Sequence, residues 1–309
     1  MDNIIEGAIS STAIDFLQYR AFCLEKGKRR GLAVVFDITN QCNLSCLGCG
    51  VDAKNIYSHK DGTSTSIDDA IIILNKIYDF VSSQSSPFYL YIGGGEPFLL
   101  NGLTEITKYA SSLFGHQNIS IDSNGTLISK TNIFTIAPSI NRLGISVDGL
   151  ESYHNWWRNP KKEGEKYSSL IRTVSELLLE KDIENKLEIS VVCTTRNIHN
   201  IPIFIDEMVS KGVKKIFFHR AIPTGRMLQR SDLIPDAKEY LLLLELVAKK
   251  KQEYYDVDIY FHNSLESIFM NLFLGNATYN QTKKGEPNTN SCIGIDPFGN
   301  VYFDPWCMT

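Results

Sequence analysis

The 309-residue sequence lacks several features that would place it in a special class of protein. No apolar run approaches the roughly 18 residues that a membrane span needs. Acidic residues outnumber basic ones by 35 to 31, which argues against a surface built to bind nucleic acid. The first ten residues contain acids where a signal peptide has bases, so we expect a cytoplasmic protein without membrane partners.

Cysteine is scarce, and its distribution along the chain is uneven. Seven cysteines are too few for a disulfide scaffold of this length, and their number is odd. Three lie within eight residues, and the other four are dispersed at Cys23, Cys193, Cys292 and Cys307. The thiols therefore need an explanation other than disulfide pairing.

The chain does contain an alternation of short β-branched segments with longer amphipathic segments. The strand-like segments cover residues 32–36, 88–92, 119–121, 143–147, 187–192 and 215–218. The helix-like segments cover residues 67–80, 101–114, 130–137, 166–181, 201–211 and 236–251. This alternation predicts a parallel α/β sheet with right-handed connections. The pattern alone leaves open whether the sheet forms a partial (β/α) barrel or a doubly wound open sheet.

The same pattern divides the chain into four regions. Residues 1–29 are predicted to be a helical segment, 30–230 the α/β core, and 231–274 a helical connection. Residues 275–309 begin with a polar loop and continue into a β-hairpin around the turn at 296–299, where Asp-Pro-Phe-Gly separates two apolar segments.

A cysteine-rich loop follows the first predicted strand. Cys42, Cys46 and Cys49 are too close for all three to pair as disulfides. Thiolates are soft ligands that select zinc or an iron–sulfur cluster. A structural zinc site normally recruits four ligands, whereas three cysteines without an obvious fourth favour a [4Fe–4S] cluster with one open iron.

This C-x3-C-x2-C loop resembles the signature loop of the radical S-adenosylmethionine (radical SAM) superfamily. The resemblance implies that Cys42, Cys46 and Cys49 hold a [4Fe–4S] cluster. It also implies that the open iron binds the amino and carboxylate groups of S-adenosylmethionine (SAM). Reduction of the cluster then cleaves SAM to methionine and a 5′-deoxyadenosyl radical.

A glycine-rich motif after the second predicted strand adds to the resemblance. Consecutive glycines expose the backbone to close approach by a ligand, although alone they would equally fit a tight turn. The motif is similar to the family's GGEP sequence, whose backbone holds the SAM ammonium group. The resemblance therefore implies SAM-binding roles for Gly93, Gly94, Gly95 and Glu96.

Polar residues follow the next predicted strands. By resemblance, Ser146 is the first candidate for contact with the SAM ribose, and Asn124 is the second. Asp148 either contacts SAM or orients a loop. Arg158 either pairs with the SAM carboxylate or forms a surface salt bridge. Because α/β barrels assemble active sites at these strand ends, the resemblance implies a partial (β/α)6 TIM-like barrel.

The dispersed thiols have separate interpretations. Cys23, in a helix-like segment, is expected to pack in the core. Cys193 either packs in the core or, as a catalytic residue, donates hydrogen to a substrate radical. Cys292 and Cys307 flank the predicted hairpin, which resembles the opening of a SPASM or twitch extension. Because Asp304 stands where that extension usually has a cysteine, two possibilities remain. Either Cys292 and Cys307 bind an auxiliary iron–sulfur cluster, or the hairpin is cluster-free and covers the barrel mouth.

Taken together, these features predict a radical SAM enzyme that abstracts a hydrogen atom from a substrate carbon. Relatives with SPASM-like tails mostly modify peptides or proteins, so we expect peptide modification of the kind that matures ribosomal peptides. The alternative is a small molecule, such as a nucleoside or sugar. An electron donor such as flavodoxin or ferredoxin is also expected. A purely electron-transferring cluster or a zinc interaction module would leave the glycine motif without a role.

Overall fold

The computed structural model describes residues 32–83, 88–262, 265, 268–269, 272–273 and 291–302. The predicted N-terminal helical segment, the polar loop at 275–290, Cys23 and Cys307 lie outside these residues. The predicted core, in contrast, lies almost entirely within them.

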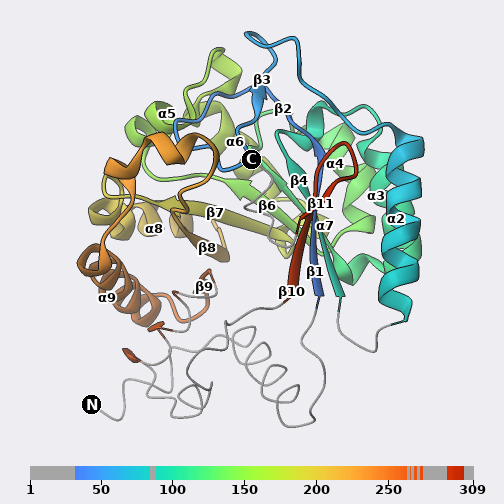
Figure 1. The fold of residues 1–309 in the computed structure, drawn as a ribbon. Helices are drawn as coiled ribbons and strands as arrows, with labels where there is room; N and C mark the ends of the chain where they lie inside the picture. Colours follow the sequence, from blue (N-terminus) through green and yellow to red (C-terminus); the bar gives the residue numbers. More distant parts are fainter. Residues whose placement is uncertain are drawn as a thin grey trace.

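A mixed sheet forms the centre of the molecule (Figure 1). Within the described residues it has nine strands in the order β11-β10-β1-β4-β5-β6-β7-β8-β9. Six of these correspond to the predicted strands: β1 (Leu32–Thr39), β4 (Phe88–Gly94), β5 (Ile119–Ser123), β6 (Arg142–Ser146), β7 (Leu187–Cys193) and β8 (Lys215–Arg220). They pair in parallel and in chain order, as the alternation predicted.

Three further strands extend the two edges of this sheet. β9 (Asp258–Phe261) pairs in parallel with β8. At the other edge, β10 (Ser291–Ile295) pairs in parallel with β1, and β11 (Val301–Tyr302) returns antiparallel to β10. The predicted hairpin is confirmed, but its first strand is part of the main sheet rather than of a separate appendage.

Helices connect the parallel strands. They are α2 (Ile67–Ser82), α3 (Leu103–Phe114), α4 (Lys130–Ile136), α5 (Glu151–Arg158), α6 (Tyr167–Leu177), α7 (Lys181–Glu184), α8 (Ile201–Ser210) and α9 (Ala237–Glu253). Ser66 caps α2 by accepting the Asp69 N–H, and Asp236 caps α9 in the same way. The pattern did not predict α5, because this short helix buries only His154 and Trp157.

The two faces of the sheet differ in chemistry. Side chains that alternate along each strand, such as Val34 and Phe36 of β1, are fully buried in one apolar core beneath the helices. The opposite face is polar: Arg142 lies between Asp122 and Glu188, at 2.7 and 2.5 Å. Because the helices cover one face only, the arrangement is a partial TIM-like barrel and not a doubly wound sheet.

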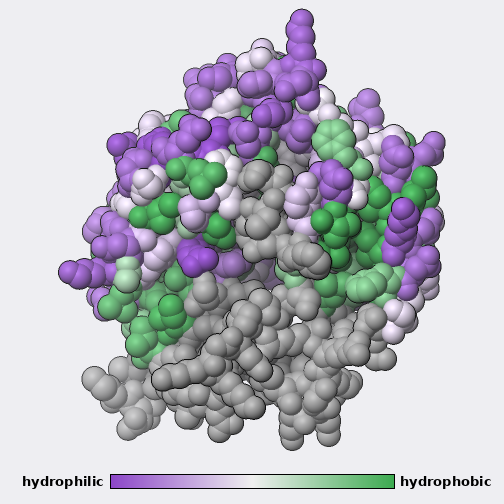
Figure 2. Space-filling model, in the orientation of Figure 1, coloured by the Kyte–Doolittle hydropathy of each residue, from purple (hydrophilic) through white to green (hydrophobic). Residues whose placement is uncertain are grey.

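The outer surface in this view is largely hydrophilic, with hydrophobic residues gathered over α9 and beside α2 (Figure 2). Exposed apolar side chains of these regions include Leu241 of α9 and Ile72 of α2. Among the described residues, no helix has the length and the apolar character required to cross a membrane.

Candidate active site

A cavity of about 140 Å³ lies at the carboxyl ends of the parallel strands. Its walls come from the cysteine loop, β4, β5 and β6, and from the end of α5. Residues that the sequence singled out make up much of its lining: Cys42, Cys46, Cys49, Gly94, Gly95, Asn124, Ser146 and Arg158. Gly93, Glu96 and Cys193 are not among the lining residues. We call this space the cluster cavity.

Each of the three thiols in the cluster cavity accepts a hydrogen bond from the protein. The backbone donors are the Leu44 N–H to Cys42 Sγ and the Ala53 N–H to Cys49 Sγ, both at 3.4 Å. The side-chain donors are Arg158 Nη1 to Cys46 Sγ and Asn124 Nδ2 to Cys42 Sγ, both at 3.7 Å. Such N–H···S bonds are typical of iron–sulfur sites, where they adjust the reduction potential. The loop is therefore built to hold sulfur ligands in fixed positions.

The three thiols line one cavity. Among the described residues, no group of three or more His, Cys, Asp or Glu side chains is arranged to hold a metal ion. Three thiols around a cavity suit a [4Fe–4S] cluster in which three irons take one thiolate each and the fourth iron is open. Burial raises the pKa of the Cys42 and Cys46 thiols, and a bound positive metal group would oppose this increase and favour the thiolates.

The glycine motif allows β4 to approach the cysteine loop closely. A Cβ atom on Gly94 would lie 2.2 Å from the Thr39 carbonyl oxygen, and one on Gly95 would lie 2.0 Å from that of Gln41. The Gly95 N–H donates to the Thr39 oxygen at 2.7 Å, and the Glu96 N–H donates to the Gln41 oxygen at 2.8 Å. The motif therefore fixes the segment that leads into Cys42.

Glu96 joins the ends of two neighbouring strands. Its buried carboxylate accepts hydrogen bonds from the Ser123 hydroxyl at 2.8 Å, the Asn124 N–H at 2.7 Å and the Phe98 N–H at 3.1 Å. Burial raises the pKa of this carboxyl to about 6, and the three hydrogen bonds oppose the increase. The side chain thus positions Asn124, while a direct contact of Glu96 with SAM stays a prediction.

The two ribose candidates differ in how they are bonded. Asn124 Nδ2 donates to Asn43 Oδ1 at 2.8 Å, and Asn124 Oδ1 accepts the Thr126 N–H at 2.9 Å. The Ser146 hydroxyl lines the cavity and forms no hydrogen bond with another described residue. Ser146 therefore has a hydroxyl available for a ligand, whereas the Asn124 side chain is engaged within the protein.

Arg158 is an internal residue and not part of a surface salt bridge. Its side chain is 14% exposed, and Nε bonds to Oδ2 of the fully buried Asp148 at 2.5 Å. Asp148 Oδ1 also accepts the Val192 N–H at 3.0 Å, so this carboxylate orients both Arg158 and β7. Arg158 Nη2 forms no hydrogen bond with a described residue and can reach a ligand carboxylate.

Two residues that the sequence analysis did not assign also hold the cysteine loop. The buried Asn43 side chain donates to Thr126 Oγ1 at 2.8 Å and to Glu165 Oε1 at 3.1 Å. Arg226, from the 3₁₀ helix Gly225–Gln229, donates to the Cys46 carbonyl oxygen at 2.8 Å. Asn43 lies inside the cysteine motif, and this position could have indicated from the sequence that Asn43 holds the loop. Nothing local in the sequence indicates that Arg226 reaches the loop.

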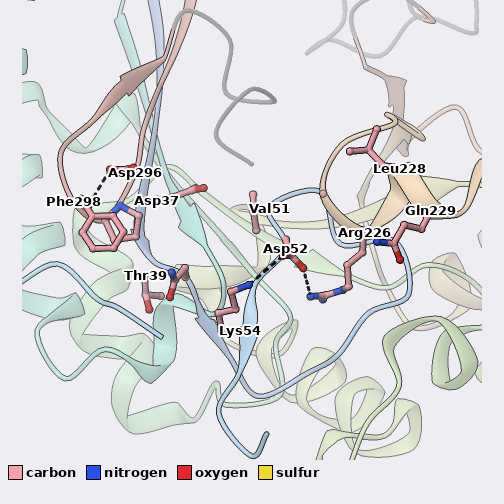
Figure 3. A pocket seen from close by; sticks show the side chains of 13 residues that line it. Asp37, Thr39, Val51, Asp52, Lys54, Arg226, Leu228, Gln229, Asp296 and Phe298 are labelled. Atoms are coloured by element: carbon pink, nitrogen blue, oxygen red, sulfur yellow. Dashed lines mark hydrogen bonds and ion pairs between the residues drawn. The ribbon is translucent and has the colours of Figure 1, made fainter. Parts of the chain in front are cut away.

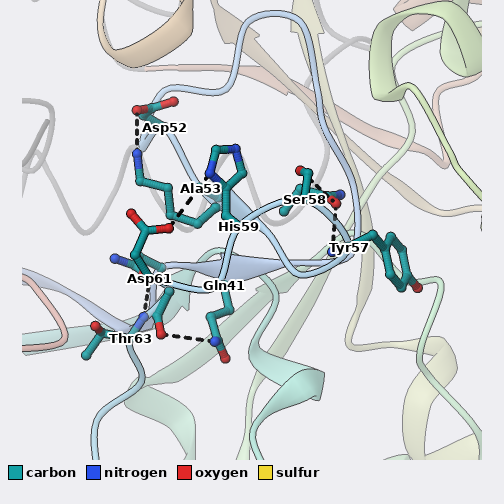
Figure 4. Close-up of polar contacts among 12 residues, drawn as sticks. Gln41, Asp52, Ala53, Tyr57, Ser58, His59, Asp61 and Thr63 are labelled. Atoms are coloured by element: carbon teal, nitrogen blue, oxygen red, sulfur yellow. Dashed lines mark hydrogen bonds and ion pairs between the residues drawn. The ribbon is translucent and has the colours of Figure 1, made fainter.

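The segment after the cysteines folds back on the residues before them (Figure 4). Gln41 Nε2 donates to the Gly62 carbonyl oxygen at 3.0 Å, and Asn40 Oδ1 accepts the Thr63 N–H at 2.6 Å. The short strands β2 (Gln41–Cys42) and β3 (Lys54–Asn55) pair beside these contacts. Cys42 is therefore held from both sides of the loop.

Of the dispersed thiols, the two in the described residues, Cys193 and Cys292, do not line the cluster cavity. Cys193 ends β7, is fully buried in the apolar core, and has a pKa well above its usual value because of that burial. This placement favours packing over hydrogen donation. Cys292 is half-buried on β10, opposite Ala33 of β1, and its proposed partner Cys307 lies outside the described residues.

A partial barrel with three thiols around a cavity at its strand ends is the arrangement expected of an enzyme that uses an iron–sulfur cluster. Residues 36–194 match the family model of the radical SAM superfamily, and this match covers just over half of the chain. The chain therefore belongs to the radical SAM superfamily, whose members use a [4Fe–4S] cluster and SAM.

Relatives and solved structures of this superfamily resemble the chain over much of its length. It is 24% identical over 286 residues to the mycofactocin maturase MftC of Mycobacterium tuberculosis, covering 92% of this chain and 67% of the maturase. It is 27% identical over 204 residues to the Fe-coproporphyrin III synthase of Methanosarcina barkeri, covering 66% of this chain and 47% of the synthase.

Among solved structures, Streptococcus suis SuiB bound to the precursor peptide SuiA has a TM-score of 0.69 at 14% identity. The match covers 96% of this chain and 64% of SuiB. SuiB bound to S-adenosylmethionine matches with a TM-score of 0.65. At this identity the likeness concerns the fold, and the chain spans less than two thirds of SuiB.

Proposed function

We propose that Cys42, Cys46 and Cys49 ligate the [4Fe–4S] cluster of this radical SAM enzyme and that the rest of the cluster cavity binds SAM. One observation carries this proposal: three thiols, each with its own N–H donor, open onto the same cavity as the ends of β4, β5 and β6. Glu96 and Asn43 hold this arrangement from outside the cavity, and Arg226 holds it from the cavity wall.

The side chains of the cavity have separate tasks in this proposal. Arg158 Nη2 pairs with the SAM carboxylate, while Asp148 keeps the guanidinium in place. The Ser146 hydroxyl contacts the ribose, and the backbone at Gly94 and Gly95 lies against the methionine part. With both groups bound, an electron from the cluster cleaves SAM and yields the 5′-deoxyadenosyl radical that takes hydrogen from the substrate.

A peptide or protein is the proposed substrate. Support comes from the SuiB structure with its precursor peptide and from the likeness to a maturase over 92% of this chain. The C-terminal hairpin, which resembles the opening of a SPASM or twitch extension, agrees with this assignment. To test it, short peptides encoded beside the gene are co-expressed with the enzyme. We expect a mass change in one peptide that disappears with Cys46→Ala.

A small-molecule substrate is the alternative. It is favoured by the 27% identity to the Fe-coproporphyrin III synthase. In that case no neighbouring peptide changes mass, while SAM cleavage without substrate remains intact. An electron donor such as flavodoxin or ferredoxin is proposed for either substrate.

The central test is anaerobic reconstitution followed by addition of dithionite and SAM. We expect about four irons per chain and formation of 5′-deoxyadenosine, both lost in Cys46→Ala because the cluster loses a ligand. Cys292→Ala is the matched variant. Unchanged iron and activity in it would rule out an auxiliary cluster at Cys292 and Cys307. A fully loaded protein without 5′-deoxyadenosine formation would contradict the proposed function.

A further inference from the structure

A second cavity, of about 400 Å³, lies beside the cluster cavity (Figure 3). Its walls are the end of β1, the turn of the β10–β11 hairpin, the segment after Cys49, and the 3₁₀ helix Gly225–Gln229. Arg226 lines both cavities, so the two spaces are neighbours. None of the SAM contacts proposed above uses the acidic side chains of this second cavity, which we call the hairpin cavity.

Asp37 of β1 points into the hairpin cavity (Figure 3) and is unusual in having no polar partner among the described residues. The residue is only 7% exposed, yet its carboxyl forms no hydrogen bond or ion pair with any of them. Gly93 leaves room for it, because a Cβ there would lie 3.4 Å from Asp37 Oδ1. Burial, followed by the charges of Asp122 and Asp296, raises its pKa to about 7. Its oxygens are not among the fully enclosed polar atoms without a partner, so they face the open cavity, where a ligand can reach them.

Asp296, in the hairpin turn, places a second carboxylate near Asp37. Its Oδ1 accepts the N–H groups of Phe298 and Asn300, both at 2.9 Å. Its Oδ2 accepts Asn300 Nδ2 at 2.8 Å and the Tyr302 hydroxyl at 3.2 Å. This carboxylate is therefore fixed by the turn itself, and its negative charge adds to that of Asp37.

The cations of the hairpin cavity are on the opposite wall and are already paired. Lys54 Nζ lies 3.2 Å from Asp52 Oδ2, and Arg226 Nη1 lies 3.0 Å from Asp52 Oδ1 (Figure 3). Because both cations share the single carboxylate of Asp52, that wall keeps a net positive charge. No cation of the described residues forms an ion pair with Asp37 or Asp296. The cavity is therefore acidic on the β1 side.

We propose that the hairpin cavity receives a positively charged group of the substrate, a protonated amine or a guanidinium, and that Asp37 recognises it. The assignment rests on the proposed function, because it treats this cavity as the substrate's place beside the SAM site. An incoming cation gives Asp37 the ionic partner that the described part of the chain does not supply, and Asp296 strengthens the attraction. In a peptide substrate, this group is a lysine or arginine side chain.

A disulfide-exchange experiment measures whether the hairpin cavity prefers a cation, and it does not require the complete substrate. Phe298 is 66% exposed and lines the cavity, so Phe298→Cys places a thiol at its rim. The reconstituted holoenzyme with this substitution is equilibrated anaerobically, without dithionite, with aminoalkyl disulfides of increasing chain length. Neutral alkyl and anionic carboxyalkyl disulfides of equal length serve as comparison probes. Tandem mass spectrometry, which resolves position 298 from Cys292 and Cys307 in the same peptide, gives the occupancy by each probe.

We expect aminoalkyl occupancy to exceed that of the neutral probe by about fivefold or more at the best chain length, with the carboxyalkyl probe lowest. Adding Asp37→Asn brings the ratio of aminoalkyl to neutral occupancy near one. Asp182→Asn, at an exposed acid of α7, leaves this ratio unchanged. Equal occupancy by all probes would overturn the proposal, as would a cation preference that survives Asp37→Asn.

Two features of the experiment keep its outcomes distinct. The comparison of probes with Asp37 in place tests the cation preference even where Asp37→Asn fails to fold. SAM cleavage is measured on the same preparations, so loss of 5′-deoxyadenosine formation counts against the proposed function and not against the cation site.

Discussion

The cluster cavity and the hairpin cavity lie side by side, but they differ in whether their buried carboxylates are bonded within the protein. Around the cluster cavity, Glu96 accepts three hydrogen bonds and Asp148 is paired with Arg158. In the hairpin cavity, Asp37 is almost as deeply buried and has no polar partner among the described residues.

The difference separates positioning residues from recognition residues. A buried acid with all its bonds satisfied by the chain has its role fixed by the fold, because it holds elements together. A buried acid left unsatisfied reduces stability, and such a cost is typical of a site that awaits a ligand. Substitutions at the two kinds of acid should therefore have opposite effects on stability.

The largest effect is expected from Arg158→Met, which leaves Asp148 buried without its cation. Loss of one partner of a buried ion pair costs about 3–5 kcal/mol in the free energy of unfolding. Cys46 also loses an N–H donor, so we expect less iron per chain after reconstitution. Urea unfolding and iron analysis measure both effects.

The matched control is Arg230→Met, because Arg230 pairs with the well-exposed Asp232. Loss of this partly exposed pair is expected to cost less than about 1 kcal/mol. Equal destabilisation by the two substitutions would show that the Asp148 pair is no more important than a surface contact.

A smaller loss is expected from Glu96→Ala. It leaves the Ser123 hydroxyl and two backbone N–H groups without their acceptor, at a cost of about 2–3 kcal/mol. Glu96→Gln keeps one oxygen acceptor and should give an intermediate urea midpoint. If Glu96→Gln unfolds as readily as Glu96→Ala, the charge of the carboxylate, and not its set of hydrogen bonds, is what matters.

The smallest change, and the only gain, is expected from Asp37→Asn. Burial raises the pKa of this carboxyl from 3.8 to about 7, so the folded protein binds the proton more tightly than the unfolded chain does. The contribution of Asp37 to the free energy of unfolding therefore falls as pH rises from about 4 to 7 and then levels off. Because asparagine does not ionise, Asp37→Asn should be more stable than the wild type by about 1–2 kcal/mol at pH 8.

The corresponding measurement is the difference in urea midpoint between the two proteins from pH 5.5 to 8.5. Taking the difference cancels the titration of Glu96 and of all other shared groups. A difference in urea midpoint that stays constant across this pH range would contradict the assignment of Asp37 as a buried acid without a partner.

The sequence predicted most of the fold because its apolar residues alternate as a barrel requires. The six central strands lie where the pattern placed them. The pairing of β10 with β1 was not predictable, because strand pairing between distant segments leaves no local signal. The short helix α5 was missed because it has few apolar residues.

The candidate site was predictable where a motif is continuous in the chain. The three cysteines, the glycine motif and the strand-end residues carried recognisable spacing, and the structure brings most of them around one cavity. Arg226 and Asp37 act through contacts between segments that are distant in the chain, which no spacing rule reveals. Whether an acid such as Glu96 or Asp37 is satisfied depends on its three-dimensional neighbours alone.

The parallel pairing of β1 with β10 also has a consequence for biosynthesis. Val34 pairs with Ile293, so the strand that leads into the cysteine loop gains one of its two neighbours only when the ribosome has passed residue 293. Until then β1 presents an open edge, which invites pairing with other chains. Iron loading is therefore expected to follow the synthesis of β10, and a chaperone that shields this edge should raise the yield of active enzyme.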